Sequence, residues 1–216
     1  MLTEMNEIEG RIVGCLVEKQ LTTPEYYPLT LNALVAACNQ KTNREPVTNY
    51  SDAEIERSLD DLRDKNLVYV FYGSSSRVPK YKHMLPSIYE LDERETALVC
   101  VLLLRGAQTV GELNQRTGRL YEFSGLNEIS ETLEALAKRG EPVVVKLERQ
   151  PGQKEARYAH LLSGEVKIEL ISNLREMPAH QSKNDRLGEL EREIENLRNE
   201  FNLFRESFEE FKKQFE

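Results

Sequence analysis

The chain has 216 residues, of which 39% are hydrophobic and 31% carry charge, and its net charge is −8. This length accommodates two small domains and an extension, and the composition is typical of a helix-rich globular protein. The net charge is −3 in residues 1–90, −2 in 91–165 and −3 in 166–216. This even distribution excludes a basic nucleic-acid-binding tail, although it leaves room for a local basic face.

Three cysteines, Cys15, Cys38 and Cys100, lie far apart in apolar, helix-like runs. An odd number of widely spaced cysteines without a secretory signal indicates reduced core residues rather than disulfides. The longest apolar run, 97–104, is far too short to cross a bilayer. We therefore expect a cytosolic, cytoplasmic protein with no membrane partner.

Hydrophobic periodicity predicts three helices and a hairpin in the first part of the chain. Ser51 and Glu54 have the spacing of a capping box, which sets the start of the third helix. The predicted elements are a helix carrying Ile8, Ile12 and Leu16, helices at 29–39 and 51–65, and strands at 67–72 and 78–83.

The second part of the chain repeats this layout. Its predicted elements are a helix carrying Leu98, Val101 and Leu102, helices at 110–117 and 126–139, and strands at 143–147 and 157–160. Matching residues occur in the same order, which indicates an internal duplication. The aligned pairs include Glu9 with Glu95, Leu16 with Leu102, Thr23 with Thr109, Glu54 with Glu128, Leu62 with Leu136 and Tyr81 with Tyr158.

The two copies differ in length before the third helix. Glu9 and Glu54 are 45 positions apart, whereas Glu95 and Glu128 are 33 apart. The first copy therefore holds about twelve extra residues, and we place most of them in the polar loop 39–50. This loop has few glycines and several hydrogen-bonding side chains, so we expect it to be ordered.

The predicted fold class is mainly α with small β hairpins, an α+β protein. Three helices closed by a hairpin form a winged helix, a helix-turn-helix with a β wing. We predict two tandem winged-helix domains at 1–88 and 89–165, a linker at 166–185 and a C-terminal coiled-coil helix at 186–216.

The C-terminal helix carries one apolar seam at heptad spacing. The seam residues are Leu187, Leu190, Ile194, Leu197, Phe201, Phe204, Phe208, Phe211 and Phe215. In a parallel pair, Arg186, Glu193 and Glu200 face residues of opposite charge at 191, 198 and 205, which favours a parallel homodimer. The alternatives are a helix that folds back on its own domains and, less favoured, a trimer or tetramer, since five phenylalanines are unusual in a dimer seam.

Several stretches resemble the bacterial YceH-like family. They include 15–20, 22–25, 27–29 and, above all, 37–47 (Ala-Cys-Asn-Gln-Lys-Thr-Asn-Arg-Glu-Pro-Val), followed by 102–109, 121–123 and 161–166. The resemblance covers about residues 5–166. It implies a tandem winged-helix protein of Gram-negative bacteria, and it implies no activity and no site residues.

The sequence contains no catalytic signature. The only histidines are His83, His160 and His180, and none has a neighbour at metal-ligand spacing. There is no glycine-rich phosphate loop and no nucleophile elbow. Cys38, beside the polar loop, is the only candidate nucleophile, and a core cysteine explains it better. We expect a non-enzymatic protein without metal or cofactor.

Two kinds of partner fit this pattern besides a second copy of the chain. Acidic residues such as Asp52, Glu54 and Glu56 begin the third helix and disfavour its ordinary insertion into a DNA groove. Basic residues of the loop and both wings can still contact DNA phosphates. The simpler interpretation is that these residues are ordinary surface charges. The candidate nucleic-acid-binding residues are Lys41, Arg44, Arg77, Lys80, Lys82, Arg149, Lys154 and Arg157, with Arg105, Arg116 and Arg119 near the second helix of copy two.

The rival class is a protein-interaction scaffold that does not bind DNA. Tyr26, Tyr27 and Tyr50 border the polar loop and can anchor a protein partner, although half-buried packing is the commoner role of such residues. We favour DNA-linked regulation over the scaffold because the winged-helix fold is often associated with DNA binding.

Overall fold

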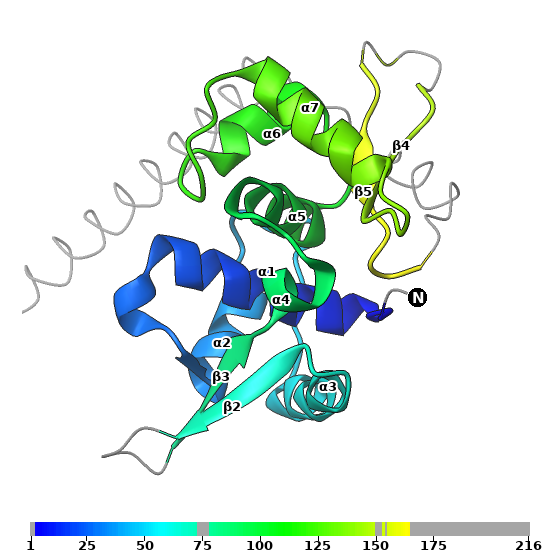
Figure 1. Ribbon diagram of the computed structural model, residues 1–216. Helices are drawn as coiled ribbons and strands as arrows, with labels where there is room; N and C mark the ends of the chain where they lie inside the picture. The colour runs from blue at the N-terminus through cyan, green and yellow to red at the C-terminus, as the bar shows by residue number, and fades with distance from the viewer. Residues whose placement is uncertain (1–2, 73–77, 150–152, 154, 165–216) are drawn as a thin grey trace, which may run out of the picture. The chain divides into compact units, whose positions relative to one another are not determined.

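The structure is a computed structural model that describes residues 3–72, 78–149, 153 and 155–164. Within these residues the chain is an α+β protein with seven α-helices, one short 3-10 helix and two small antiparallel sheets (Figure 1). The predicted linker at 166–185 and helix at 186–216, with the whole heptad seam, lie outside the described residues, as do Arg77, Lys154 and His180.

The first half of the described chain forms helices and a three-stranded sheet with the order β1-β3-β2. The Ser51–Glu54 capping box is confirmed: the Ser51 and Glu54 side chains each bind the other's backbone N–H at the start of α3. The elements are α1 (Glu7–Thr22), η1 (Pro24–Tyr26), β1 (Leu29–Thr30), α2 (Leu31–Cys38), α3 (Asp52–Asp64), β2 (Val68–Tyr72) and β3 (Pro79–His83).

A short helix then leads into the second half, whose two strands form their own sheet. The predicted second helix of this half is confirmed at both ends. The elements are α4 (Leu85–Tyr89), α5 (Glu93–Arg105), α6 (Val110–Thr117), α7 (Leu126–Ala137), β4 (Val144–Lys146) and β5 (Tyr158–His160).

Equivalent backbone hydrogen bonds connect the third helix to the hairpin in both halves. The N–H of Leu67 donates to the Leu62 carbonyl, and the N–H of Val143 donates to the Leu136 carbonyl. The carbonyls of Leu67 and Val143 then accept from Met84 and Leu161 respectively. Because the same bonds join aligned residues, the structure supports the duplication read from the sequence.

The extra residues of the first half lie in two places rather than mainly in the loop. Thr30 and Thr109 both cap a second helix, and Leu29 and Gln108 both pair with the aligned tyrosines of the hairpins. Thr109 therefore corresponds to Thr30, and its sequence alignment with Thr23 is wrong. The offset between aligned residues is therefore 86 at Glu9, 79 at Thr30 and 74 at Glu54. About seven extra residues precede α2, where the first half contains η1 before its sheet strand. About five more follow α2, in the polar loop.

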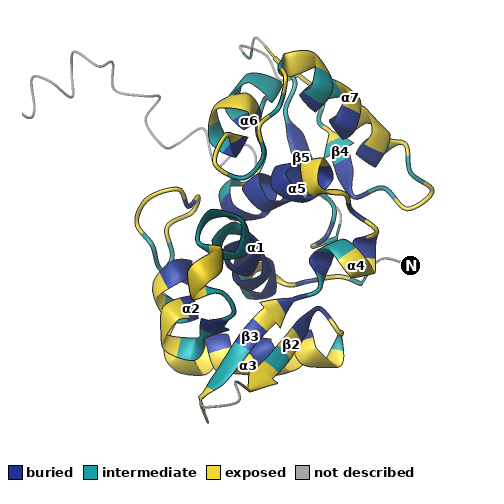
Figure 2. Ribbon diagram, turned by 60° about the vertical axis from the view of Figure 1, so that its left-hand side comes forward, coloured by how far each residue is buried: buried dark blue, intermediate teal, exposed yellow. Residues whose placement is uncertain are grey.

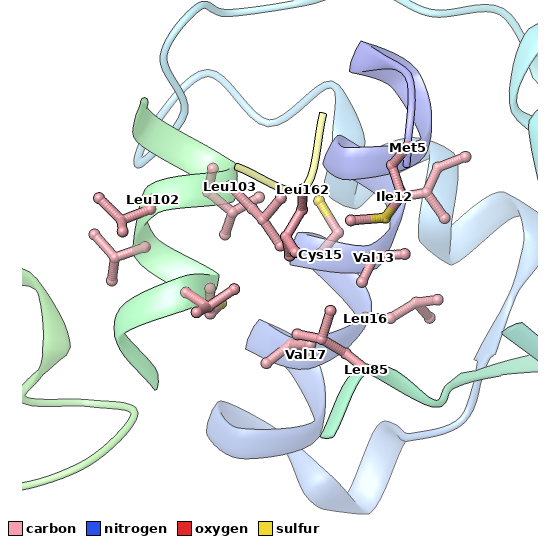
Figure 3. Packing of buried hydrophobic residues seen from close by; sticks show 14 of the residues in the cluster. Met5, Ile12, Val13, Cys15, Leu16, Val17, Leu85, Leu102, Leu103 and Leu162 are labelled. Atoms are coloured by element: carbon pink, nitrogen blue, oxygen red, sulfur yellow. The ribbon is translucent and has the colours of Figure 1, made fainter. Parts of the chain in front are cut away.

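The first helices of the two halves, α1 and α5, lie side by side in the middle of the core (Figures 1 and 2). They approach closely at Gly14, where an added Cβ would lie 2.9 Å from Leu104 Cδ2. The Cys100 thiol donates to the Gly14 carbonyl oxygen over 3.4 Å. Gly14 and Cys100 are aligned positions, so the two repeats meet through equivalent surfaces. Figure 3 shows side chains from both helices, with Leu162, in this shared apolar core.

The polar loop between α2 and α3 is held at both ends. The Asn39 side chain donates to the Tyr50 carbonyl and accepts from the Tyr50 N–H, both at 2.7 Å. In between, Arg11 Nη2 donates to the Pro46 carbonyl over 2.6 Å, and the Glu45 N–H donates to the Leu104 carbonyl of α5. These bonds agree with the expectation of an ordered loop and tie it to both halves.

Candidate nucleic-acid interface

One face of the β1-β3-β2 sheet is exposed and combines aromatic with basic side chains. Tyr69 lies opposite Lys82, and Phe71 lies opposite Lys80. Residues directly opposite on antiparallel strands project from the same face, so these four side chains form one surface. We call Tyr69, Phe71, Lys80 and Lys82 the outer sheet face. Tyr69 is 63% exposed and Phe71 51% exposed, and the exposed stretches of both strands are yellow in Figure 2.

The other face of the same sheet packs on the helices. Val68, Tyr81 and His83 are buried there, and Val70 packs against the core. Burial, with a smaller effect from the charge of Lys82, lowers the pKa of His83 to about 4. The alternation of buried and exposed residues fixes the register, since a shift by one residue would exchange the two faces.

Two acidic residues of α3 act on the buried face of the sheet. Glu56 and Asp60 act electrostatically on the inward-facing Tyr81, where they contribute to raising its pKa after the larger effect of burial. The Glu54 carboxylate accepts from the Ser51 hydroxyl and N–H, and these bonds lower the pKa of Glu54. The acids of the first turn thus stabilise the helix start.

Arg44 is buried. Its guanidinium is therefore not available to contact phosphates, and the sequence prediction for this residue is wrong. Its guanidinium donates to both oxygens of Glu18, at 2.6 and 3.1 Å, and to the carbonyls of Ala37 and Asn43 and the side chain of Gln40. These bonds use all five donors of the guanidinium. The side chain has no exposed area. Arg44 therefore holds the loop on α1.

The remaining predicted residues do not form one stripe in the described structure. Lys41 is exposed in the loop and Arg149 is exposed beyond β4. Arg157 of the second hairpin donates to both oxygens of Glu112 and to the Ala107 carbonyl. Arg157 therefore packs within the second half, and among the described candidates Lys80 and Lys82 lie on one face of the sheet.

Sequence reasoning missed the two aromatic residues of the outer sheet face. The signal was present in the run Val-Tyr-Val-Phe-Tyr at 68–72, which predicts a strand with its aromatic residues at alternate positions. Alternate residues of a strand lie on opposite faces, but the pattern alone does not predict which face is buried. The valines face the core, and this leaves Tyr69 and Phe71 in solvent.

The three cysteines are buried and free, as predicted. A hydrogen bond with Cys15, together with burial, raises the pKa of the Cys38 thiol, which makes it a poor nucleophile. Within residues 3–164, the described positions bring no three His, Cys, Asp or Glu side chains together as metal ligands. No described helix has both the length and the apolarity needed to cross a membrane.

Known proteins resemble this chain over nearly its whole length. A family described as "Protein of unknown function, DUF480" matches residues 5–153. A UPF0502 protein of Opitutus terrae is 50% identical over 198 residues, which span 91% of this chain and 84% of that protein. UPF0502 proteins of Pelobacter propionicus and Geotalea uraniireducens are 45% and 46% identical, covering 98% and 100% of both chains. The chain therefore belongs to the DUF480/UPF0502 family of bacterial proteins.

Proposed function

We propose that this chain is a non-enzymatic, cytosolic, dimeric binding protein of two tandem winged-helix domains that contacts DNA through the outer sheet face. The pairing of aromatic and lysine side chains on one exposed surface carries the proposal. Lysines neutralise backbone phosphates, and exposed aromatic rings provide contact area for sugars and bases. DNA-linked regulation is the role that such a protein would serve.

The order of elements supports the winged-helix interpretation. In the first half, a strand before the second helix pairs with a hairpin that follows the third helix. The second half has the same order, with the single bridge Gln108–Tyr158 in place of that first strand. In this arrangement the outer sheet face belongs to the wing.

A salt-dependent binding measurement tests the DNA contact. We expect the full chain to bind random duplex DNA at about 50 mM salt and much more weakly at about 200 mM, because bound phosphates release counterions. The double variant Lys80→Ala, Lys82→Ala should bind more weakly, with a salt slope smaller by about two. The matched control is Lys138→Ala with Arg63→Ala, which removes two exposed cations, one just after α7 and one at the end of α3.

The protein-scaffold alternative makes the opposite prediction. Without detectable DNA binding at about 50 mM salt, where phosphate contacts are strongest, the DNA contact is refuted. A stoichiometric protein partner that is lost in Tyr69→Ala, Phe71→Ala would then assign the outer sheet face to protein docking, since exposed aromatic residues are frequent interface anchors.

The proposed parallel dimer rests on the heptad seam from Leu187 to Phe215 and its oppositely charged flanking pairs. Dimerisation would present two outer sheet faces to one DNA molecule. Sedimentation of the full chain should give twice the mass expected for one chain, and a chain ending at Asp185 should sediment as a monomer. Equal monomeric masses would refute the dimer.

A further inference from the structure

A polar pocket of about 280 Å³ lies where the two halves meet, and none of its lining residues belongs to the outer sheet face. It is enclosed by the end of α1, the loop between α2 and α3, the end of α5 and the end of α6. Val101, Leu104 and Leu120 contribute apolar lining. Its volume is near the lower limit of small-molecule sites, about 300 Å³.

Four cationic side chains line this pocket: Lys19, Arg105, Arg116 and Arg119. Glu18 is the only carboxylate among the lining residues, and both of its oxygens accept hydrogen bonds from Arg44. The pocket therefore has a surplus of positive charge, in a chain whose net charge is −8.

The arginines of the pocket have few anionic partners among the residues that the structure describes. Arg105 donates to the amide oxygen of Asn43, a neutral group. Arg116 and Arg119 make no ion pair with any described residue, and Arg116 Nη1 is buried without a hydrogen-bond acceptor from the described chain. Burial, followed by the like charges of Arg116 and Arg44, lowers the pKa of Arg105.

Such an arrangement is costly unless an anion completes it. A buried N–H without an acceptor and neighbouring like charges both destabilise the folded state. An anion that accepts from several guanidinium groups removes both penalties, and phosphate oxygens match the fork of the arginine side chain.

We propose that this pocket binds the phosphate group of a small phosphorylated molecule. The pocket is a concave site at the junction of α1, the loop and α6, which suits a compact ligand better than a polynucleotide. Because its walls come from both halves, the ligand would bridge the two repeats. The site is independent of the proposed DNA contact, since it shares no residue with the outer sheet face.

Titration with inorganic phosphate and pyrophosphate tests this site, with binding followed by calorimetry and by the melting temperature of the full chain. We expect pyrophosphate to bind and to raise the melting temperature, since a ligand that binds only the folded state stabilises it. Arg119→Ala, on an exposed side chain, and Arg116→Ala should each weaken binding about tenfold or more, as expected for the loss of a charged hydrogen bond. The control Lys138→Ala, which removes an exposed cation just after α7, should bind like the parent chain.

Three outcomes would overturn the proposal. The first is no binding of pyrophosphate up to about 10 mM, weaker than any millimolar site. The second is unchanged affinity in both Arg119→Ala and Arg116→Ala while circular dichroism shows folded protein. The third is weaker duplex DNA binding in these variants without any pyrophosphate binding, which would make the cluster a backbone contact of DNA instead.

Discussion

The two halves repeat their stabilising interactions and differ in their surfaces. In the first, Glu9 closes the capping box of α1 and pairs with Lys65 just after α3, at 2.7 Å. In the second, Glu95 closes the capping box of α5 and pairs with Arg139 just after α7, at 2.8 Å. One carboxylate thus fixes the start of the first helix to the end of the third in each half. The aligned residues Glu9 and Glu95 therefore have the same structural role in the two halves.

The outer sheet face has only a partial counterpart in the second half, where Arg157 keeps the basic character of Lys80 but Ala159 is buried. With the hairpins aligned at Leu67 and Val143, the positions of Tyr69 and Phe71 are occupied in the second half by Val145 and Leu147. The position of Lys82 is occupied by Ala159. In the first half the paired aromatic and lysine residues lie on an exposed face of a three-stranded sheet, whereas in the second half Lys146 pairs with the buried Tyr158. The proposed DNA contact therefore uses a surface of the half with the insertions, whereas most of the cationic side chains of the proposed phosphate pocket come from the other half.

The largest effect expected from this comparison is at the repeated acid–base pair. Lys65→Met and Arg139→Met should each lower the free energy of unfolding by about 3 kcal/mol, because each leaves a buried carboxylate without its cation. Urea denaturation of the two variants measures the loss. Arg63→Ala, which breaks an exposed pair with Asp60, is the control and should cost less than about 1 kcal/mol. If only one of the two variants is destabilised, the pairs are not equivalent.

The aligned histidines extend the comparison to pH. Burial is the main cause that lowers the pKa of His83 to about 4, and it alone lowers that of His160 to about 4, from an ordinary 6.5. Between these values the unfolded chain binds more protons than the folded chain, so stability is present above pH 6.5 and is lost as the pH falls towards 4. Each histidine should contribute about 3 kcal/mol to this loss.

Single substitutions separate the two contributions. His83→Gln and His160→Gln should each flatten the dependence of the unfolding free energy on pH between 6.5 and about 4.5, measured by denaturation at a series of pH values. The pKa of Glu18 is a different case: burial raises it, but the bonds and charge of Arg44 outweigh burial and leave it below 4.5. Its contribution is lost only at lower pH. A parent chain with constant stability from pH 7 to 4.5 would contradict buried neutral histidines.

The sequence predicts the elements that follow from local chemistry. The ends of α6 and the Ser51–Glu54 capping box depend on neighbouring residues, and both are confirmed. The two-residue strand β1 was missed because its pairing with β3 lies about 50 residues away and two residues show no periodicity. The short helix α4 was missed because it has only five residues, including Pro86, too few for a helical pattern.

The candidate site was less predictable because it depends on contacts between residues that are far apart in the sequence. Lys80 and Lys82 lie on one face because alternate strand residues always do. Arg44 was misplaced because its partner Glu18 is 26 positions away, and a polar loop sequence does not show which of its cations is buried. The aromatic half of the outer sheet face and the pocket around Arg116 both depend on which surfaces pack together, and that depends on the tertiary fold.

The smallest effect expected concerns the junction between the halves. At Gly14 of α1 an added Cβ would lie 2.9 Å from Leu104 Cδ2 and 3.2 Å from Leu103 Cβ, whereas at Gly10 the nearest atom is 3.4 Å away. Alanine is favoured over glycine within a helix by about 1 kcal/mol, and overpacking costs about 1–3 kcal/mol. Gly10→Ala should therefore raise the free energy of unfolding by up to about 1 kcal/mol, and Gly14→Ala should lower it by about 1 kcal/mol.

Urea denaturation of these two variants side by side gives the sign of each change. Both substitutions add the same methyl group to the same helix, so helix propensity cancels and the difference between them reports the packing of α1 on α5. A positive change in both variants would mean that the Leu104 side chain moves aside at little cost. The packing of the two repeats at Gly14 would then be loose enough to accept a methyl group. The close approach of the aligned positions Gly14 and Cys100 would in that case contribute little to the stability of the junction.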